Sequence, residues 1–203
     1  MFELFLFIDP LCKKCMKAEN VVTNISNDLE YKFKFQFIPI LNLKIISKTL
    51  KKMEKYDNNI TINDVHNLYY QILLDYKAAM FQGMKRGRTF LMYLQEELLF
   101  NNRTYSNDLV FSIAEKAKID LEMFKEDRVS ELAKKEIRKD QILVNQMNIK
   151  SPDSAVLFDC KKINSDGILL KDINYSILFK TCCREKIFDM KKYNNFCKLH
   201  VIK

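Results

Sequence analysis

The chain has 203 residues, of which 48% are hydrophobic and 12% aromatic, and its formal net charge is +8. Such a composition can bury a core and excludes an intrinsically disordered chain, while the length fits one domain or one domain with an inserted subdomain. Of its three glycines only Gly83 and Gly87 lie close together, which excludes a glycine-rich phosphate loop and a dinucleotide-binding fingerprint.

The N-terminal part of the sequence predicts a strand, a helix and a second strand. Residues 2–8 form a short apolar run ended by Asp9 and Pro10, which is typical of a strand buried on both faces. Residues 12–28 follow with apolar side chains at helical spacing. In residues 31–37 aromatic and polar side chains alternate, and this period of two predicts a strand.

Between residues 43 and 148 the apolar pattern changes to the period of a helix. Asn63 is the expected cap of one helix, and Gly83 follows its end. The helices that we expect in this segment span residues 62–81, 89–100, 106–118, a short stretch from 120, and 128–147. The segment is therefore predicted to be all-helical, without an internal repeat or a low-complexity linker.

Strand signals return after Pro152. Residues 155–159 and 168–170 flank a turn at 164–167 that contains Asn, Ser, Asp and Gly, which indicates a β-hairpin. Residues 175–186 then predict a last helix. Strands at both ends of the chain, with helices between them, predict an α/β fold in which one sheet is completed after a helical insertion.

The net positive charge is concentrated near the C-terminus. Residues 180–203 contain seven Lys and Arg against two Asp and Glu, so this segment supplies +5 of the +8. The nearly balanced remainder argues against a phosphate-binding stripe and a nucleic-acid partner. No stretch reaches the roughly 18 apolar residues of a membrane span, and no signal peptide is recognisable. We therefore expect a cytoplasmic protein with no membrane partner, whose thiols stay reduced.

The sharpest motif is Cys12-Lys13-Lys14-Cys15, which follows a predicted buried strand and opens a helix. A thiol at a helix N-terminus lies near unpaired N–H groups and the positive end of the dipole, which stabilise a thiolate, and the two lysines add positive charge. Cys12 is the more exposed position and would attack a disulfide, while Cys15, one turn deeper, would resolve it. The pair predicts a thioredoxin-type redox-active or redox-sensing site.

A CxxC pair also occurs as half of a zinc site, which is the alternative interpretation of Cys12 and Cys15. The other cysteine and histidine candidates for such a site are His66, Cys182, Cys183, Cys197 and His200. Among these, Cys197 and His200 have a suitable spacing to complete the site. The redox interpretation requires no cofactor. Cys160 ends an apolar strand and is expected to be a buried small hydrophobe.

Pro152 is the second candidate site residue, because it precedes the strand predicted at residues 155–159. In thioredoxin folds a cis-proline at this place lies opposite the cysteine pair and exposes backbone groups to a partner peptide. We therefore expect a cis peptide bond between Ser151 and Pro152. The alternative is an ordinary proline that ends the preceding helix.

Several segments together resemble the DsbA-like, FrnE-type branch of the thioredoxin family, and within it the ClpXP adaptors of Firmicutes. The segments that carry the resemblance are Phe2–Cys15, Gln82–Leu91, Lys118–Asp127 and Asp140–Met147, with the proline and strand that follow. The resemblance covers roughly residues 2–178 and is more specific than any single motif in it.

The resemblance implies a thioredoxin-like domain of the DsbA type at residues 1–42 and 149–186 and an α-helical insertion at 43–148. The basic tail at 187–203 lies outside the resemblance. It also implies a cytoplasmic adaptor that binds the redox-responsive regulator Spx and presents it to the ClpXP protease, without a small-molecule substrate or bond chemistry of its own. The CxxC motif by itself favours a cytoplasmic thiol-disulfide oxidoreductase instead. The two functions are compatible if the cysteine pair senses redox state and alters partner binding.

Overall fold

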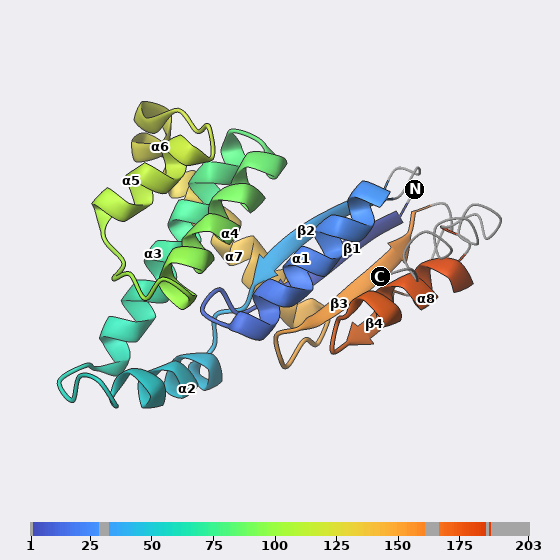
Figure 1. Ribbon diagram of the computed structural model, residues 1–203, viewed down its shortest axis with the longest axis horizontal. Coiled ribbons are helices and arrows are strands. Elements are labelled where there is room, and N and C mark those ends of the chain that lie inside the picture. The colour runs from blue at the N-terminus through green and yellow to red at the C-terminus, as the bar shows by residue number, and fades with distance from the viewer. Residues whose placement is uncertain (1, 29–32, 161–166, 186, 188–203) are drawn as a thin grey trace, which may run out of the picture. The chain divides into compact units, whose positions relative to one another are not determined.

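The computed structural model describes residues 2–28, 33–160, 167–185 and 187 of the chain (Figure 1). The elements in chain order are β1 (Phe2–Ile8), α1 (Lys13–Asp28), β2 (Phe33–Pro39), α2 (Leu43–Met53), α3 (Ile62–Phe81), α4 (Met84–Leu99), α5 (Asn107–Lys116), α6 (Leu121–Asp127), α7 (Glu131–Gln146), β3 (Ser154–Asp159), β4 (Ile168–Lys171) and α8 (Tyr175–Arg184). Helices α2 to α7 all follow β2 and precede β3 in the sequence, which confirms the α/β fold with a helical insertion.

The chain divides into two compact units. The first comprises residues 1–6, 17–36 and 153–203, and the second comprises residues 7–16 and 37–152. The first unit contains most of the sheet together with most of α1 and all of α8. The second contains both residues of the cysteine pair and helices α2 to α7. Among the helices that the structure describes, none combines the length and the apolar character needed to cross a lipid bilayer.

The strands form a sheet in the order β2-β1-β3-β4. β3 and β4 pair antiparallel, with Ser154 opposite Lys171 and Leu157 opposite Ile168. This pairing confirms the predicted hairpin, whose turn residues 161–166 lie outside the described part of the chain. In β1 the side chains of Leu4 and of residues 6–8 are fully buried. Because consecutive side chains of a strand point to opposite faces, the C-terminal half of β1 is buried on both faces of the sheet, as the apolar run predicted.

Helix α3 is the central helix of the second unit, since it packs against α2, α4, α6 and α7 (Figure 1). Its bounds agree with the sequence prediction, but its cap is Thr61 and not Asn63. The Thr61 hydroxyl accepts a hydrogen bond from the Asp64 N–H, and the Asp64 carboxylate accepts one from the Thr61 N–H, which satisfies two free donors at once. Buried polar side chains on this helix, Asp75 and Lys77 among them, require partners on other elements.

The helical part differs from the sequence prediction chiefly at α4 and α2, while the ends of α5 and α7 differ by at most three residues. α4 begins at Met84 instead of Thr89. Gly83 is its N-cap residue and has a φ of 127°, which glycine adopts without strain. Gly87 lies inside the helix, and because it has no side chain it interrupts the apolar pattern of the sequence. A Cβ at Gly87 would lie 2.5 Å from the Met80 Cγ, so glycine allows α3 and α4 to pack closely. α2 is a separate helix whose bounds the periodicity did not define.

The two charged side chains buried on α3 each form an ion pair. The fully buried Asp75 carboxylate lies 2.8 Å from the Nε of Arg128 and accepts a hydrogen bond from the Tyr105 hydroxyl at 2.5 Å. The Lys77 Nζ lies 2.6 Å from a carboxylate oxygen of Asp140 on α7, and both side chains are buried. Burial raises the pKa of Asp75 to about 6, while the Arg128 charge opposes this rise. Helix α3 is thereby tied to α7 and to the end of α6.

Arg128→Gln removes the positive charge beside buried Asp75. We expect the free energy of unfolding at neutral pH to fall by about 3–5 kcal/mol, because an uncompensated charge stays buried. Since the pKa of folded Asp75 is raised above its unfolded value, protonation favours the folded state, and the loss should shrink as the pH is lowered to about 5. Urea unfolding at both pH values measures this. Lys139→Ala, which removes the exposed partner of Glu136, should cost about 1 kcal/mol or less, and an equal cost for both variants would contradict the prediction.

Candidate functional site

Cys12 is the N-cap residue of α1. Its N–H donates a hydrogen bond to the Asp9 carbonyl at 3.1 Å, and its own carbonyl accepts one from the Met16 N–H at 3.1 Å. The chain therefore turns tightly between the end of β1 and the start of α1, within the second unit. This turn places the Cys12 side chain at the helix N-terminus, as the sequence predicted, where free N–H groups stabilise a thiolate.

The two cysteines of the motif form no disulfide in the structure and differ in exposure. Cys12 is half-buried and Cys15 is fully buried, which confirms the predicted order of exposure. The Asp9 N–H donates a hydrogen bond to the Cys15 Sγ at 3.4 Å, and the Cys15 thiol is hydrogen-bonded to the Cys12 sulfur. The pair thus has one accessible sulfur and one internal sulfur in contact with it.

The surroundings separate the pKa values of the two thiols. The pKa of Cys12 is lowered to about 6, chiefly because the Cys15 thiol donates a hydrogen bond to its thiolate, with further help from the N–H groups of Cys15 and Lys14. Partial burial and the Asp9 charge oppose this shift. The pKa of Cys15 is raised, because its proton is held in the hydrogen bond to Cys12 and because it is buried. At neutral pH this arrangement gives a nucleophilic Cys12 thiolate beside a protonated Cys15.

Asp9 anchors the turn that presents Cys12. Its Oδ1 accepts hydrogen bonds from the Leu11 N–H at 2.9 Å and from the Tyr69 hydroxyl of α3 at 2.8 Å. The Tyr69 oxygen also lies 2.8 Å from the Thr49 hydroxyl of α2, which acts as the donor because the Tyr69 proton goes to Asp9. Burial and the Asp9 charge raise the pKa of Tyr69, so its hydroxyl stays protonated. The sequence indicates Asp9 only as the end of a strand, and no local pattern in it indicates the roles of Tyr69 and Thr49.

Lys13 has a different role from the one that the sequence suggested. Its Nζ lies 4.7 Å from the centroid of the Phe100 ring, at the end of α4. The main causes of the low Cys12 pKa are hydrogen bonds and not the lysine charges. Lys13 therefore connects the start of α1 with the helical part of the second unit.

The peptide bond before Pro152 is trans, because the described residues contain no cis peptide bond. The predicted cis-proline is therefore wrong. The chain bends at the next residue, Asp153, whose φ of 65° is left-handed and whose carbonyl accepts a hydrogen bond from the Asp172 N–H at 3.1 Å. With the turn made at Asp153, the bond to Pro152 keeps the trans form, which is favoured by about 0.5–1 kcal/mol.

The remaining candidates contribute no metal site to the described part of the chain. There, no three His, Cys, Asp or Glu side chains form a group that could hold a metal ion. The zinc candidates Cys197 and His200, and the basic tail apart from Ile187, lie outside the described residues. The His66 ring stacks on Tyr70 at a centroid distance of 6.2 Å. In α8, Cys182 is buried and Cys183 is half-buried. Cys160 is exposed, because β3 ends at Asp159, so the predicted burial of Cys160 is wrong.

Residues 5–181 match the family model described as thioredoxin. The chain is 27% identical over 199 residues to the ClpXP adapter protein SpxH of Bacillus subtilis, in a match that covers 88% of this chain and 67% of that protein. It is 29% identical over 171 residues to the SpxH protein of Staphylococcus saprophyticus, with 84% and 60% covered. The chain thus spans about two thirds or less of the length of these curated relatives.

Solved structures share the fold. A putative protein disulfide isomerase from Nitrosomonas europaea matches with a TM-score of 0.66 and 14% identity, covering 91% of this chain and 98% of its own. The thiol-disulfide exchange protein alpha-DsbA2 from Wolbachia pipientis matches with a TM-score of 0.57 and 15% identity, covering 92% and 80%. These likenesses show a thioredoxin-like fold of the DsbA type with an inserted helical subdomain.

The alkylation rate of Cys12 should follow the titration of its thiolate. We expect the rate with iodoacetamide to rise with a midpoint near pH 6 and to level off above it, because the thiolate is the reactive form. Cys15 should stay unmodified in the folded protein. Trypsin cuts after Lys13 and Lys14, so mass spectrometry reports each cysteine separately. A Cys12 midpoint at the value of a free thiol, about 8.5, would contradict the predicted hydrogen bond.

Asp9→Asn should lower the pKa of Cys12 further. The Asp9 charge raises this pKa by repulsion, whereas an amide oxygen can still accept the hydrogen bonds from Leu11 and Tyr69. The midpoint of the alkylation profile should therefore move to lower pH. Asp108→Asn, at an exposed position of α5, makes the same change of charge and should leave the midpoint unchanged. An unmoved or higher midpoint in Asp9→Asn would show that Asp9 does not act on the thiolate through its charge.

Proposed function

The chain belongs to the thioredoxin family, and we propose that within it the protein is an adaptor that binds the regulator Spx and promotes its degradation by the ClpXP protease. The observation that carries this proposal is the similarity, over most of this chain, to proteins named ClpXP adapter protein SpxH. On this proposal the protein is cytoplasmic and acts through protein–protein contact. It needs no cofactor and forms or breaks no covalent bond in its substrate.

The thiol pair gives such an adaptor a means of responding to oxidants. The Cys12 thiolate can attack a disulfide of low molecular mass, which forms a mixed disulfide and releases one thiolate. Cys15 then loses its proton and attacks the Cys12 sulfur, which leaves a Cys12–Cys15 disulfide and releases the second small thiol, with the proton passing to the departing sulfur. The hydrogen bond from the Asp9 N–H to the Cys15 Sγ would change with this oxidation, and so would the turn that Asp9 anchors.

A thiol-disulfide oxidoreductase is the second candidate function. The observation that favours it is the combination of an accessible Cys12, with a pKa of about 6, and a buried, protonated Cys15. Thiol-disulfide exchange requires these two roles, since one cysteine attacks the disulfide and the other resolves the mixed disulfide. In that case the same two steps would turn over on protein disulfides, with a cytoplasmic thiol restoring the reduced pair.

Reconstituted proteolysis separates the two functions. We expect the wild-type chain to accelerate the degradation of Spx by ClpXP above the rate without adaptor. Under reducing conditions, Cys12→Ala/Cys15→Ala should accelerate it equally, because presentation of a partner needs no bond chemistry. Gel electrophoresis of Spx over time measures both rates.

The controls identify which proposal fails. No acceleration by the wild-type chain would contradict the adaptor function. Acceleration that depends on both cysteines under reducing conditions would favour the oxidoreductase. Insulin reduction, measured in parallel, reports thiol turnover directly, and the cysteine-free variant gives its background.

A further inference from the structure

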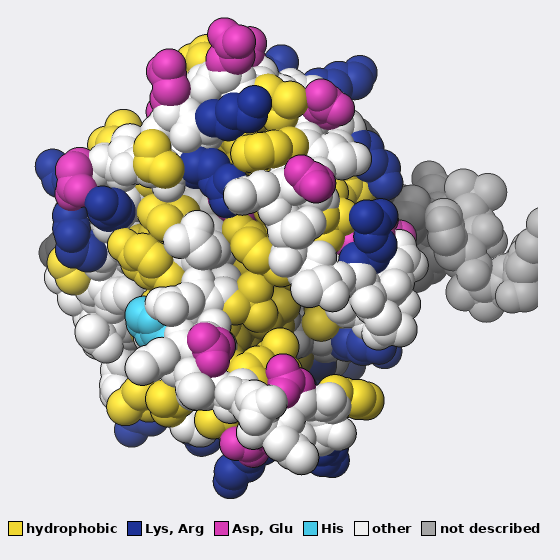
Figure 2. All heavy atoms as spheres, turned by 90° about the vertical axis from the view of Figure 1, so that its left-hand side faces the viewer, with side chains coloured by type: hydrophobic (Ala, Val, Ile, Leu, Met, Phe, Trp, Pro, Cys, Tyr) yellow, Lys and Arg dark blue, Asp and Glu magenta, His cyan; other side chains and the backbone are white. Residues whose placement is uncertain are grey.

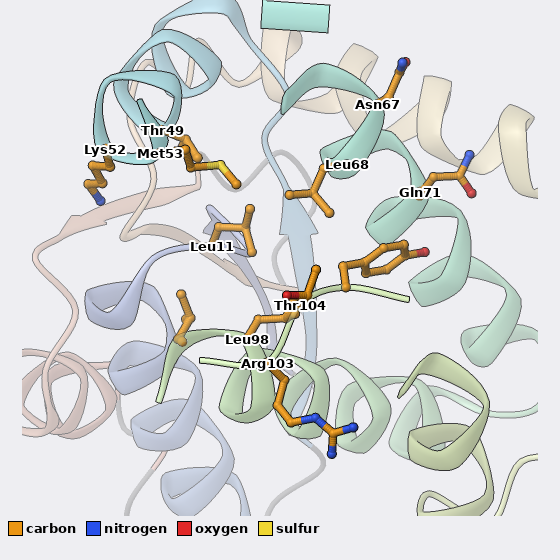
Figure 3. Close-up of a pocket in the computed structure, with 12 residues that line it drawn as sticks. Leu11, Thr49, Lys52, Met53, Asn67, Leu68, Gln71, Leu98, Arg103 and Thr104 are labelled. Atoms are coloured by element: carbon orange, nitrogen blue, oxygen red, sulfur yellow. The ribbon is translucent and has the colours of Figure 1, made fainter. Parts of the chain in front are cut away.

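A cavity of about 560 Å³ opens in the second unit, where side chains of α2, α3 and α4 line it together with residues 103–105 (Figure 3). Its volume lies within the range of about 300–1,000 Å³ typical of ligand sites. The apolar residues that line it are Leu11, Met53, Leu68, Leu98 and Leu99. The cavity can therefore receive at least one large hydrophobic side chain.

The charged side chains that line this cavity are all positive. Lys52 and Arg103 are its two charged lining residues, and no Asp or Glu lines it. The sequence of α2 also contains Lys44, Lys48 and Lys51 and no acidic residue. Figure 2, which faces the left-hand side of Figure 1, shows hydrophobic side chains along the middle of this face, with charged side chains of both signs around them. An occupant with a carboxylate beside its apolar group would complement these charges.

The cavity is open to solvent along one side. Asn67 and Gln71 on α3 and Thr104 after α4 line it and are exposed. Their amide and hydroxyl groups can hydrogen-bond to the backbone of a chain segment that crosses the opening. A closed apolar cavity would suit a fatty acid, whereas an open one with polar groups along its rim favours a peptide.

The cavity also adjoins the thiol site. Leu11 lines it and directly precedes Cys12, and its N–H is held by the Asp9 carboxylate. Thr49 lines it as well and is hydrogen-bonded to Tyr69, which in turn donates to Asp9. A segment bound in the cavity would contact residues that fix the turn before the thiolate.

We propose that this cavity is the docking site for a segment of a partner protein that carries a large apolar side chain next to a carboxylate. The cavity binds the apolar side chain, and the positive charges of Lys52 and Arg103, which lie on opposite sides of it, attract the acidic group (Figure 3). This inference rests on the proposed adaptor function only for the identification of that partner with Spx.

Selection from a library of random peptides displayed on phage tests the proposal on the full chain. The enriched peptides should carry an aromatic or large aliphatic residue beside Asp or Glu. A synthetic peptide from this pool should bind the Lys52→Glu/Arg103→Glu variant at least about tenfold more weakly than wild type, because like charges then meet. Lys85→Glu/Arg86→Glu, which changes the charge equally on exposed residues at the start of α4, should change its affinity by less than about twofold. Fluorescence anisotropy measures the affinities, and circular dichroism confirms that both variants are folded.

Several results would overturn the docking site. They are no enrichment of peptides, equal binding by both charge variants, no loss of affinity when the peptide's carboxylate is replaced by its amide, or binding of dodecanoate in the cavity without binding of any peptide. Leu68→Gln, which changes the apolar floor and leaves the charges intact, should also weaken the peptide, and unchanged affinity would count against the cavity.

Competition with Spx separates this inference from the adaptor function. Displacement of Spx by the selected peptide would support the cavity as the place where the adaptor's partner docks. If Spx binds the chain and the peptide does not displace it, the identification of the cavity's partner with Spx is overturned. If the peptide binds as expected and Spx does not bind the chain, the docking site is supported and the adaptor function fails.

Discussion

The structure of the second unit depends on the polar side chains that α3 carries into its interior. A buried charge without a partner costs several kcal/mol, so Asp75 and Lys77 can stay buried only if other elements supply opposite charges. α7 and the end of α6 supply them. The Tyr69 hydroxyl donates a hydrogen bond to the Asp9 carboxylate, and the Tyr76 hydroxyl donates one to the carbonyl of Phe37 in β2 at 3.2 Å. One helix therefore fixes the helices around it and the turn that holds the thiols.

This constraint connects the helical part of the chain with its thiol chemistry. Asp9 is held by Tyr69, so the backbone of the turn is fixed before α1 begins. Cys12 is then placed where helix N–H groups and the Cys15 thiol stabilise its thiolate, against the opposing charge of Asp9. The reactivity of Cys12 is thus a balance between a favourable helix terminus and an unfavourable carboxylate, and the helical insertion holds that carboxylate in place.

The proposed adaptor function and the thiol chemistry are compatible in this arrangement. The proposed docking cavity and the thiol turn share Leu11 and, through Thr49 and Tyr69, one hydrogen-bond chain that ends on Asp9. A ligand can shift an equilibrium only by its differential affinity for the two states. Partner binding and thiol oxidation would be coupled to the extent that oxidation moves Asp9 or Leu11, and the coupling would be reciprocal.

The sequence by itself determined the features that depend on neighbours along the chain: the strand β1, the bounds of α3, the hairpin of β3 and β4, and a cysteine pair that opens a helix. Apolar periodicity and capping residues report these directly. The tertiary structure alone decided the partners of Asp9 and Asp75, the trans bond at Pro152 and the exposure of Cys160. Tyr69 lies 60 residues from Asp9, and no local pattern marks it as a partner. Such contacts are selected by the burial of polar groups, which exists only once the helices have packed.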